Sequence, residues 1–437
     1  MHDPLDLRDL VGDEYQQRRE SGYDVGDLGS AVANRSVSSL AELEQLYMQL
    51  TARPRRSWDY VEPEQLDDIL DASPAGRDQH APSGSLAAAS ADRILAGWLG
   101  RIAGCNVGKP VEDGDVWTSD RIRAYLELAG AYPLRDYIPV LDPMPDGYQL
   151  RDCWTETTLG NVDGSARDDD IDYAILGVAL LEQYGRGLTP DHVATGWLAH
   201  LPYLRVYTAE RATYANLLRG VAVGEAADVR NPYREWIGAL IRADVFGWVL
   251  PGRPREAACL AYADATLSHR ANGVYAAMWA AALVSCAGVA ETVREAFDAS
   301  LGYVPGGSRL DEALRRVQRL HADGASWEVA LAVIQERYGH YSWVHSINNS
   351  CIIAAGLLWG QGDHAATVGL TVQGGWDTDS NGATAGSVAG TVVGTRNLPD
   401  RLIGPLHDTT RSAVFGFDNS AISELARRTT RLAASFG

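Results

Sequence analysis

The chain has 437 residues, of which 46% are hydrophobic and 22% are charged, and this composition is typical of a globular protein with a large core. Its 57 acidic and 38 basic residues leave a formal charge of -19. A surface of that sign repels phosphate backbones and anionic lipid, so we expect no nucleic-acid partner and no membrane partner. The five cysteines form no CxxC pair and the amino terminus does not resemble a secretory signal, which together indicate a cytoplasmic protein with reduced thiols.

The first 85 residues differ from the rest of the chain because they are polar and contain five prolines, four of them between residues 54 and 82. A capping box formed by Ser39 and Glu42 predicts a short helix that continues through Leu50. The run at residues 81–85 is loop-like in composition. We therefore interpret residues 1–85 as a partly helical amino-terminal extension that either packs on the main domain or stays partly mobile. Residues 86–437 form that main domain.

Helical periodicity dominates from about residue 90 onward. Asp92 is expected to cap a helix with apolar positions between residues 94 and 102, and residues 171–181 and 236–241 also show helical spacing. Alternating β-branched stretches are few, so the pattern predicts one all-α domain. The apolar stretch at residues 273–290 is rich in alanine and glycine and is isolated. It is interpreted as a helix buried on all sides, not as a membrane span.

Two predicted helices carry glycine at every fourth position. These glycines are Gly100, Gly104 and Gly108 in one helix and Gly382, Gly386, Gly390 and Gly394 in the other. Residues four apart share a helix face, so each helix presents a stripe that another backbone or a ligand can approach closely. Close helix packing in the core is the favoured interpretation, because both segments are too short and too polar for a membrane dimer motif.

Three adjacent carboxylates, those of Asp168, Asp169 and Asp170, follow a glycine-containing loop and precede an amphipathic pattern. Carboxylates at a helix amino terminus are favourable by themselves, because the helix dipole stabilises negative charge there. Three in succession, however, repel one another unless a cation lies among them. Oxygen ligands of this kind suit Mg²⁺, Mn²⁺ or Ca²⁺.

A second acidic motif occupies residues 374–380, with the sequence Gly-Gly-Trp-Asp-Thr-Asp-Ser. Asp377 and Asp379 are two apart, a spacing that converges on an extended segment, so we expect both to precede a helix starting near Asn381. Ser380 adds a hydroxyl group, although a simple helix cap would also place one there. The two motifs together supply five carboxylates and a hydroxyl, enough for two cations about 4 Å apart. Zinc is disfavoured because no His or Cys stands near either motif in the sequence.

Three blocks, residues 93–112, 168–173 and 374–380, resemble in order and spacing the motifs of the ADP-ribosylglycohydrolase family (dinitrogenase-reductase-activating glycohydrolase type), in a bacterial branch. The resemblance implies an all-α orthogonal helical bundle with two Mg²⁺ or Mn²⁺ ions in a central cleft, and residues 86–437 as the catalytic domain. It implies the metal ligands Asp168, Asp169, Asp170, Asp377, Asp379 and Ser380, the catalytic residues Glu112, Asp169 and Asp170, Asp172 behind the ligands, and His345 and Asn349 near the substrate. The glycines Gly374 and Gly375, next to a helix amino terminus, and the adjacent Trp376 are further expected substrate contacts.

The chain departs from the family pattern at three places. Asp168 stands where the family usually has Thr or Ser, and Cys105 and Asn106 replace the usual Asp-Ala. Trp376 is inserted after the two glycines, where it is able to stack on a base or to wall off a ribose pocket. These departures suggest a branch whose substrate need not be a modified protein.

The expected activity is metal-dependent hydrolysis of the glycosidic bond at C1 of an ADP-ribosyl ribose, in a protein-linked or small-molecule substrate. The nearest alternative is an N-glycosidase that acts on a small nucleoside or nucleotide in a biosynthetic pathway. A catalytically silent ADP-ribose-binding protein is the alternative from another class.

Overall fold

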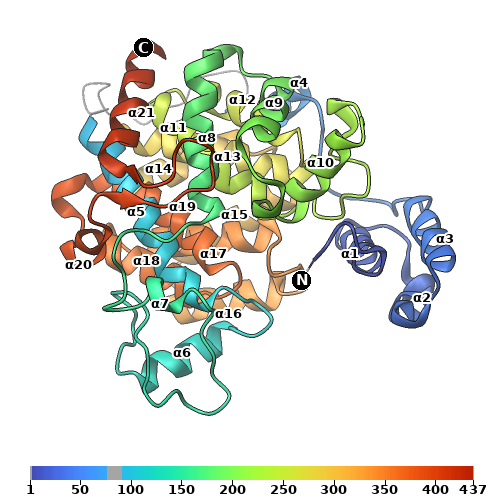
Figure 1. Ribbon diagram of the computed structural model, residues 1–437, viewed down its shortest axis with the longest axis horizontal. Coiled ribbons are helices and arrows are strands. Elements are labelled where there is room, and N and C mark those ends of the chain that lie inside the picture. Colours follow the sequence, from blue (N-terminus) through green and yellow to red (C-terminus); the bar gives the residue numbers. More distant parts are fainter. Residues whose placement is uncertain (1, 76–90, 437) are drawn as a thin grey trace.

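The computed structural model describes residues 2–75 and 91–436. This part of the chain is built almost entirely from helices, so the predicted all-α fold is confirmed (Figure 1). The described β-structure is one antiparallel pair, β1 (Thr409–Thr410) and β2 (Ser420–Ala421), with Thr409 opposite Ala421.

The helices follow one another along the chain in four groups. The first group is α1 (Leu7–Glu20), α2 (Gly29–Ala33), α3 (Leu40–Thr51) and α4 (Leu66–Ala72). The second is α5 (Ala91–Gly108), α6 (Ser119–Leu128), α7 (Trp154–Thr157), α8 (Asp169–Tyr184), α9 (Pro190–His200) and α10 (Thr208–Leu218). The third is α11 (Asp244–Val249), α12 (Pro254–Ala265), α13 (Ala271–Ala287), α14 (Val293–Ser300), α15 (Arg309–Ala322) and α16 (Trp327–Tyr338). The last is α17 (Ser346–Trp359), α18 (His364–Gln373), α19 (Thr378–Val393), α20 (Asp400–Ile403) and α21 (Ile422–Phe436).

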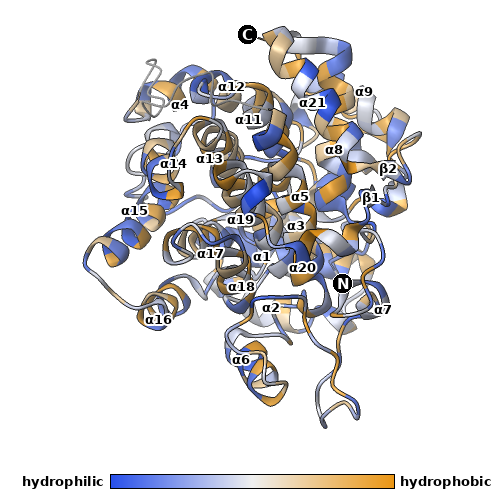
Figure 2. Ribbon diagram, turned by 90° about the vertical axis from the view of Figure 1, so that its left-hand side faces the viewer, coloured by the Kyte–Doolittle hydropathy of each residue, from blue (hydrophilic) through white to orange (hydrophobic). Residues whose placement is uncertain are grey.

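Helix α13 forms the centre of the core, as its apolar sequence predicts. Every residue from Asn272 to Ala287 is buried, and the helix contacts α11, α12, α14, α17 and α19 (Figure 2). In the described part of the chain, no helix combines the length and the hydropathy that a membrane crossing requires.

The two glycine stripes pack against each other and bring the backbones of α5 and α19 into direct contact. A Cβ atom on Gly382 would lie 2.5 Å from the carbonyl oxygen of Gly104, and one on Gly386 would overlap the carbonyl oxygen of Gly100. The partners run in opposite directions along the two helices, so the helices are antiparallel. As a result, the carboxyl end of α5 lies beside the amino end of α19.

Three local predictions are corrected by the structure. Asp92 does not cap α5; it lies in the first turn, and its carboxylate accepts a hydrogen bond from the backbone N–H of Thr395, 3.2 Å away. The segment after Trp236 is a 3-10 helix, Ile237–Arg242. Helix α19 begins at Thr378, so Asp379 lies in its first turn and not on an extended segment. Side-chain periodicity does not fix a helix end, because caps and neighbouring segments decide it.

The amino-terminal segment, residues 2–75, packs on the main body. Its predicted capping box is present at the start of α3. Gln17 of α1 donates a hydrogen bond to Glu235 of the main body at 2.9 Å. Ser21, which follows α1, donates a second one to the same carboxylate at 2.6 Å. Arg309 binds Glu62 at 2.7 Å. The predicted loop at residues 81–85, and the boundary between residues 85 and 86, lie outside the described residues.

The glycine contact yields a prediction about stability. Replacement of Gly386 by Ala forces a methyl group against the backbone of α5, which is unable to move without repacking the core. We expect Gly386→Ala to lower the free energy of unfolding in urea by about 1–3 kcal/mol or more. Gly224→Ala is the matched control, because a Cβ atom there meets nothing within 4 Å. Equal stability of the two variants would contradict the close approach of the helices.

A second prediction concerns Glu20, which lies between the amino-terminal segment and the main body. Its Oε1 accepts a hydrogen bond from the backbone N–H of Ser342 at 2.7 Å. Burial, with Glu235 nearby, raises the pKa of Glu20 from 4.5 to about 7. Between pH 4.5 and about pH 7, Glu20 is ionised in the unfolded chain and protonated in the folded chain. Its contribution therefore lowers the free energy of unfolding increasingly as the pH rises through this range.

Replacement of Glu20 by Gln removes this pH-dependent cost. We expect the melting temperature of Glu20→Gln, relative to the parent chain, to rise between pH 5 and pH 8 and to level off above. The exposed substitution Glu328→Gln serves as the control. A constant difference across this pH range would show that Glu20 does not retain its proton in the fold.

Candidate metal centre

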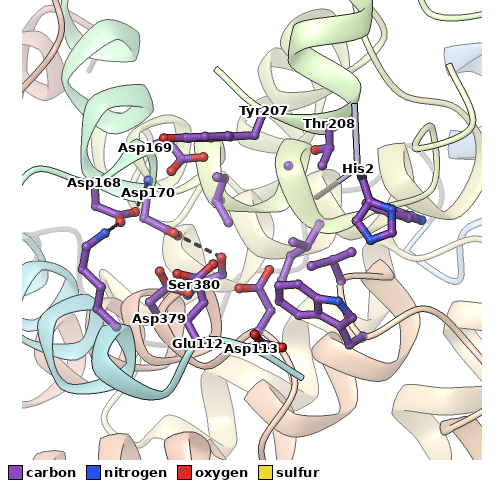
Figure 3. A pocket seen from close by; sticks show the side chains of 18 of the residues that line it. His2, Glu112, Asp113, Asp168, Asp169, Asp170, Tyr207, Thr208, Asp379 and Ser380 are labelled. Atoms are coloured by element: carbon purple, nitrogen blue, oxygen red, sulfur yellow. Dashed lines mark hydrogen bonds and ion pairs between the residues drawn. The ribbon is translucent and has the colours of Figure 1, made fainter. Parts of the chain in front are cut away.

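A cavity of about 560 Å³ opens where α5, α8 and α19 meet. Acidic side chains from all three regions line it (Figure 3). They come from the segment that follows α5, which carries Glu112, from the amino end of α8, and from the amino end of α19. The two acidic motifs predicted from the sequence therefore face one cavity.

Each acidic motif begins a helix. Asp168 is the N-cap residue of α8, and its side chain accepts a hydrogen bond from the backbone N–H of Asp170 at 2.9 Å. Asp377 precedes the first residue of α19, and Asp379 follows inside the first turn. The hydroxyl group of Thr378 donates to the carbonyl oxygen of Gly108 at 2.8 Å, which ties the start of α19 to the end of α5.

The carboxylates form two groups that share one residue. Ligand atoms of Cys105, Asp168, Asp170 and Asp379 all lie within 4.8 Å of one another, and those of Glu112, Asp377 and Asp379 do the same. Asp379 therefore stands between two possible cation positions. Asp169 belongs to neither group within the described residues, and in Figure 3 it lies beside Tyr207. The sequence interpretation did not include Cys105 as a group near the cations.

The chemistry of this donor set fits hard divalent cations. Burial raises the pKa of Asp170 and of Asp377 well above the ordinary value, and in both cases the charge of Asp379 adds to the rise. Glu112 is raised in pKa for the same two reasons. The Oδ1 atom of Asp170 accepts no hydrogen bond from the described residues. Its charged neighbour Arg101 lies 3.5 Å away, beyond a good hydrogen bond. A cation among these oxygens would relieve their repulsion and bind this Oδ1 atom directly.

Cys105 does not change this preference. Burial raises the pKa of its thiol well above the ordinary value, and the charge of Asp170 adds to the rise. In the absence of a cation the sulfur is therefore a neutral thiol, whereas metal ions bind the thiolate. Oxygen ligands dominate the site.

Two basic side chains, a half-buried lysine and a buried arginine, fix the start of α8, and the sequence interpretation assigned a role to neither. Lys109 forms an ion pair with Asp168. The Arg101 side chain is fully buried; it donates to the carbonyl oxygen of Asp170 at 2.7 Å and pairs with Asp244, also at 2.7 Å. Each of the two residues comes directly after a glycine of the α5 stripe. Only the packing of α8 against α5 reveals their partners.

Basic and aromatic groups line the cavity beyond the carboxylates. Arg167 and Arg211 both lie over the ring of Tyr207, at 6.0 and 5.3 Å from its centre, and all three line the cavity. Asp172, predicted to lie behind the ligands, binds Arg167 through its Oδ2 atom at 2.7 Å and Ser412 through its Oδ1 atom, also at 2.7 Å. It therefore positions a cavity arginine and contacts no carboxylate of the cluster through these bonds.

The five predicted substrate contacts are not among the residues that line the cavity. Asn349 is buried behind the second acidic motif, where its Oδ1 accepts hydrogen bonds from the backbone N–H of Asp377 (3.3 Å) and the side chain of Asn381 (2.7 Å). His345 caps α17 and is fully buried. Trp376 belongs to the hydrophobic core. Gly374 and Gly375 form the turn before it, in which Gly375 and Trp376 have φ values of 78° and 61°.

Comparison with known proteins identifies the family of this chain. The sequence profile of the ADP-ribosylglycohydrolase family matches residues 86–435, and the chain belongs to that family. One solved structure, titled "ADP-ribosylglycohydrolase-related protein complex", matches at 19% sequence identity and a TM-score of 0.43, over 78% of this chain and 98% of that chain. A comparison with curated proteins gave no significant match.

The shared position of Asp379 yields a prediction about cations. Replacement of Asp379 by Asn removes a ligand from both groups at once, so we expect it to abolish the rise in melting temperature that Mg²⁺ or Mn²⁺ produces in the parent chain. Asp120→Asn, an exposed substitution in α6, should leave that rise unchanged. If neither cation changed the melting temperature of the parent chain, the result would show that the cluster binds neither of them.

Proposed function

We propose that the protein hydrolyses the glycosidic bond at C1 of an ADP-ribosyl ribose with the help of two divalent cations, Mg²⁺ or Mn²⁺. The observation that carries this proposal is the sharing of Asp379 by two carboxylate-rich groups of possible ligands in a chain of the ADP-ribosylglycohydrolase family. Two cations bridged by one carboxylate are typical of sites that orient an oxygen-rich substrate and its attacking water.

The residues divide into those that hold cations and those that act on the substrate. Asp168, Asp170 and Asp377 join Asp379 as cation ligands, and Ser380 donates to Asp170 at 3.1 Å and orients it. Bound cations would supply Lewis acidity and a water of lowered pKa. The remaining negative charge of the cluster stabilises the positive charge that develops at C1 as the bond to the leaving group breaks.

Glu112 is the group best placed to accept a proton from the attacking water. Its side chain is 20% exposed and is the most open carboxylate of its group, and it lies on the segment that follows α5. Arg151 pairs with it at 3.2 Å and limits its movement. A carboxylate near a reacting water contributes to catalysis by general base action.

The diphosphate of the substrate needs positive charge in a protein whose net charge is -19. Arg167 and Arg211 line the cavity and lie over the ring of Tyr207. Figure 3 shows Tyr207 across the cavity from Asp379. Guanidinium groups bind phosphate oxygens in pairs of parallel hydrogen bonds. These two arginines, rather than the helix amino termini, therefore provide the local attraction for the diphosphate.

A hydrolysis screen tests the proposal and separates the alternatives. The purified chain is incubated with Mg²⁺ or Mn²⁺ and with ADP-ribosyl-arginine, ADP-ribosyl-serine, O-acetyl-ADP-ribose and free nucleotides, and product release is measured. We expect cation-dependent release of ADP-ribose from at least one ADP-ribosyl compound. Turnover of free nucleotides alone would identify a nucleotide N-glycosidase instead. Tight binding of ADP-ribose with no turnover of any compound would identify a silent binding protein.

The role of Glu112 is tested with the best substrate of this screen. We expect Glu112→Gln to lower kcat by about 10²- to 10⁴-fold, because the amide is unable to accept the proton. The affinity for ADP-ribose, measured by calorimetry, should change much less. Asp115→Asn, which also alters a carboxylate that lines the cavity, is the matched control. An equal kcat in both variants would contradict the assignment of Glu112 as the base.

A further inference from the structure

One wall of the cavity is built by residues that lie outside the family match. His2, in the amino-terminal segment, lines the same cavity as the carboxylates (Figure 3). Its ring packs edge-to-face against Trp236, with ring centres 4.9 Å apart and planes at 84°. The match to the ADP-ribosylglycohydrolase family begins only at residue 86. The amino-terminal segment therefore adds to the site a group that the family match does not include.

The position of His2 is fixed by specific contacts. The Nδ1 atom of His2 lies 2.9 Å from Oδ1 of Asp13 in α1. The Oδ2 atom of the same aspartate accepts a hydrogen bond from the hydroxyl group of Tyr233, also at 2.9 Å. Tyr233 packs against Trp236, with ring centres 4.7 Å apart. Two aromatic residues of the main body and one carboxylate of α1 therefore hold the His2 ring at the cavity wall.

The same segment supports the backbone that carries Trp236. Glu14 of α1 pairs with Arg234 at 3.1 Å. Glu235 is only 4% exposed and is held by Ser21 and Gln17 on the amino-terminal side and by Arg309 on the other, at 2.5 Å. Trp236 and Ile237, which follow directly, line the cavity. This wall is therefore backed by α1.

We propose that the amino-terminal segment is part of the substrate site, and that His2 is a specificity-determining residue whose ring contacts the purine ring of the ADP-ribosyl group. The proposal rests on the function proposed above. The purine is the flat aromatic ring that every ADP-ribosyl compound carries. The His2 side chain is 35% exposed, whereas Trp236 is only 4% exposed and supports the His2 ring from behind. His2 therefore offers an aromatic surface to such a ring, and aromatic rings pack favourably against one another.

The size and the layout of the cavity agree with this assignment. A volume of about 560 Å³ falls within the range of about 300–1,000 Å³ that encloses small ligands. Figure 3 places His2 across the cavity from Asp168, with Tyr207 and Thr208 along the wall between them. The ribose at the carboxylates, the diphosphate at Arg167 and Arg211 and the purine at His2 then follow the covalent order of ADP-ribose.

Binding measurements on the full chain test the proposal without relying on turnover. Calorimetry with ADP-ribose and with ribose 5-phosphate, which lacks the purine, compares the parent chain with His2→Ala. We expect His2→Ala to weaken the binding of ADP-ribose about fivefold to tenfold and to leave the binding of ribose 5-phosphate unchanged. His2→Phe, which keeps an aromatic ring, should retain most of the affinity for ADP-ribose.

Asp27→Asn is the matched control, because Asp27 lies in the same segment but is exposed, does not line the cavity and pairs with Arg53 at 2.5 Å. Equal affinity of His2→Ala and Asp27→Asn for ADP-ribose would overturn this inference and leave the proposed function intact. Equal weakening of both ligands in His2→Ala would also overturn it, because a collapsed wall and not a lost ring contact would then be the cause. A parent chain that binds no ADP-ribose would overturn the proposed function and this inference together.

Discussion

The backbone contact between α5 and α19 is the constraint on which the site depends. Glycine at every fourth position removes the side chains that would hold the two helices apart, so the carbonyl groups of one helix touch the backbone of the other. The antiparallel arrangement then leaves only one place for the start of α19, beside the end of α5. Thr378 fixes that place through the carbonyl oxygen of Gly108. Asp377 and Asp379 face Glu112 for this reason, although more than 260 residues separate them in the sequence.

Helix α5 also positions the third part of the acidic cluster. Arg101 lies on α5 and donates to the carbonyl oxygen of Asp170, while its other nitrogen pairs with Asp244. A fully buried guanidinium that lost either partner would be strongly destabilising, so the start of α8 is held firmly. The helices that carry the carboxylates therefore form a rigid frame and stay in place in spite of the repulsion among these charges. Such a frame keeps ligands in position for a cation and does not allow them to move apart.

The amino-terminal segment is joined to this frame by buried polar contacts and by α4, which packs Ile69 and Leu70 into the main hydrophobic core. Glu235 and Arg309 stand at the centre of the junction and contact residues from both sides. Buried ion pairs of this kind require all partners to be present, because an unpaired buried charge is costly. The segment is thus held in one specific orientation, and that orientation brings His2 to the cavity. The sequence left open whether the extension packs on the main domain or stays partly mobile, and residues 2–75 of it pack on the main body through these contacts.

The sequence by itself determined the features that depend on neighbouring residues. Periodicity predicted the all-α fold and the buried helix α13, the capping box predicted α3, and the adjacent carboxylates predicted an acidic centre at the starts of two helices. Local patterns carry this information because helix formation and burial repeat every few residues. The pattern did not set helix ends, and Asp92 and Asp379 lie inside helices for that reason.

Only the tertiary structure decided which distant groups meet. It paired the two glycine stripes, set Asp379 between two groups of ligands, and placed Asn349 behind the cluster, away from the cavity wall. It also brought Lys109 to Asp168 and His2 to Trp236. These contacts depend on the packing of elements far apart in the chain, and the spacing of residues within one element carries no information about the partner that the packing selects.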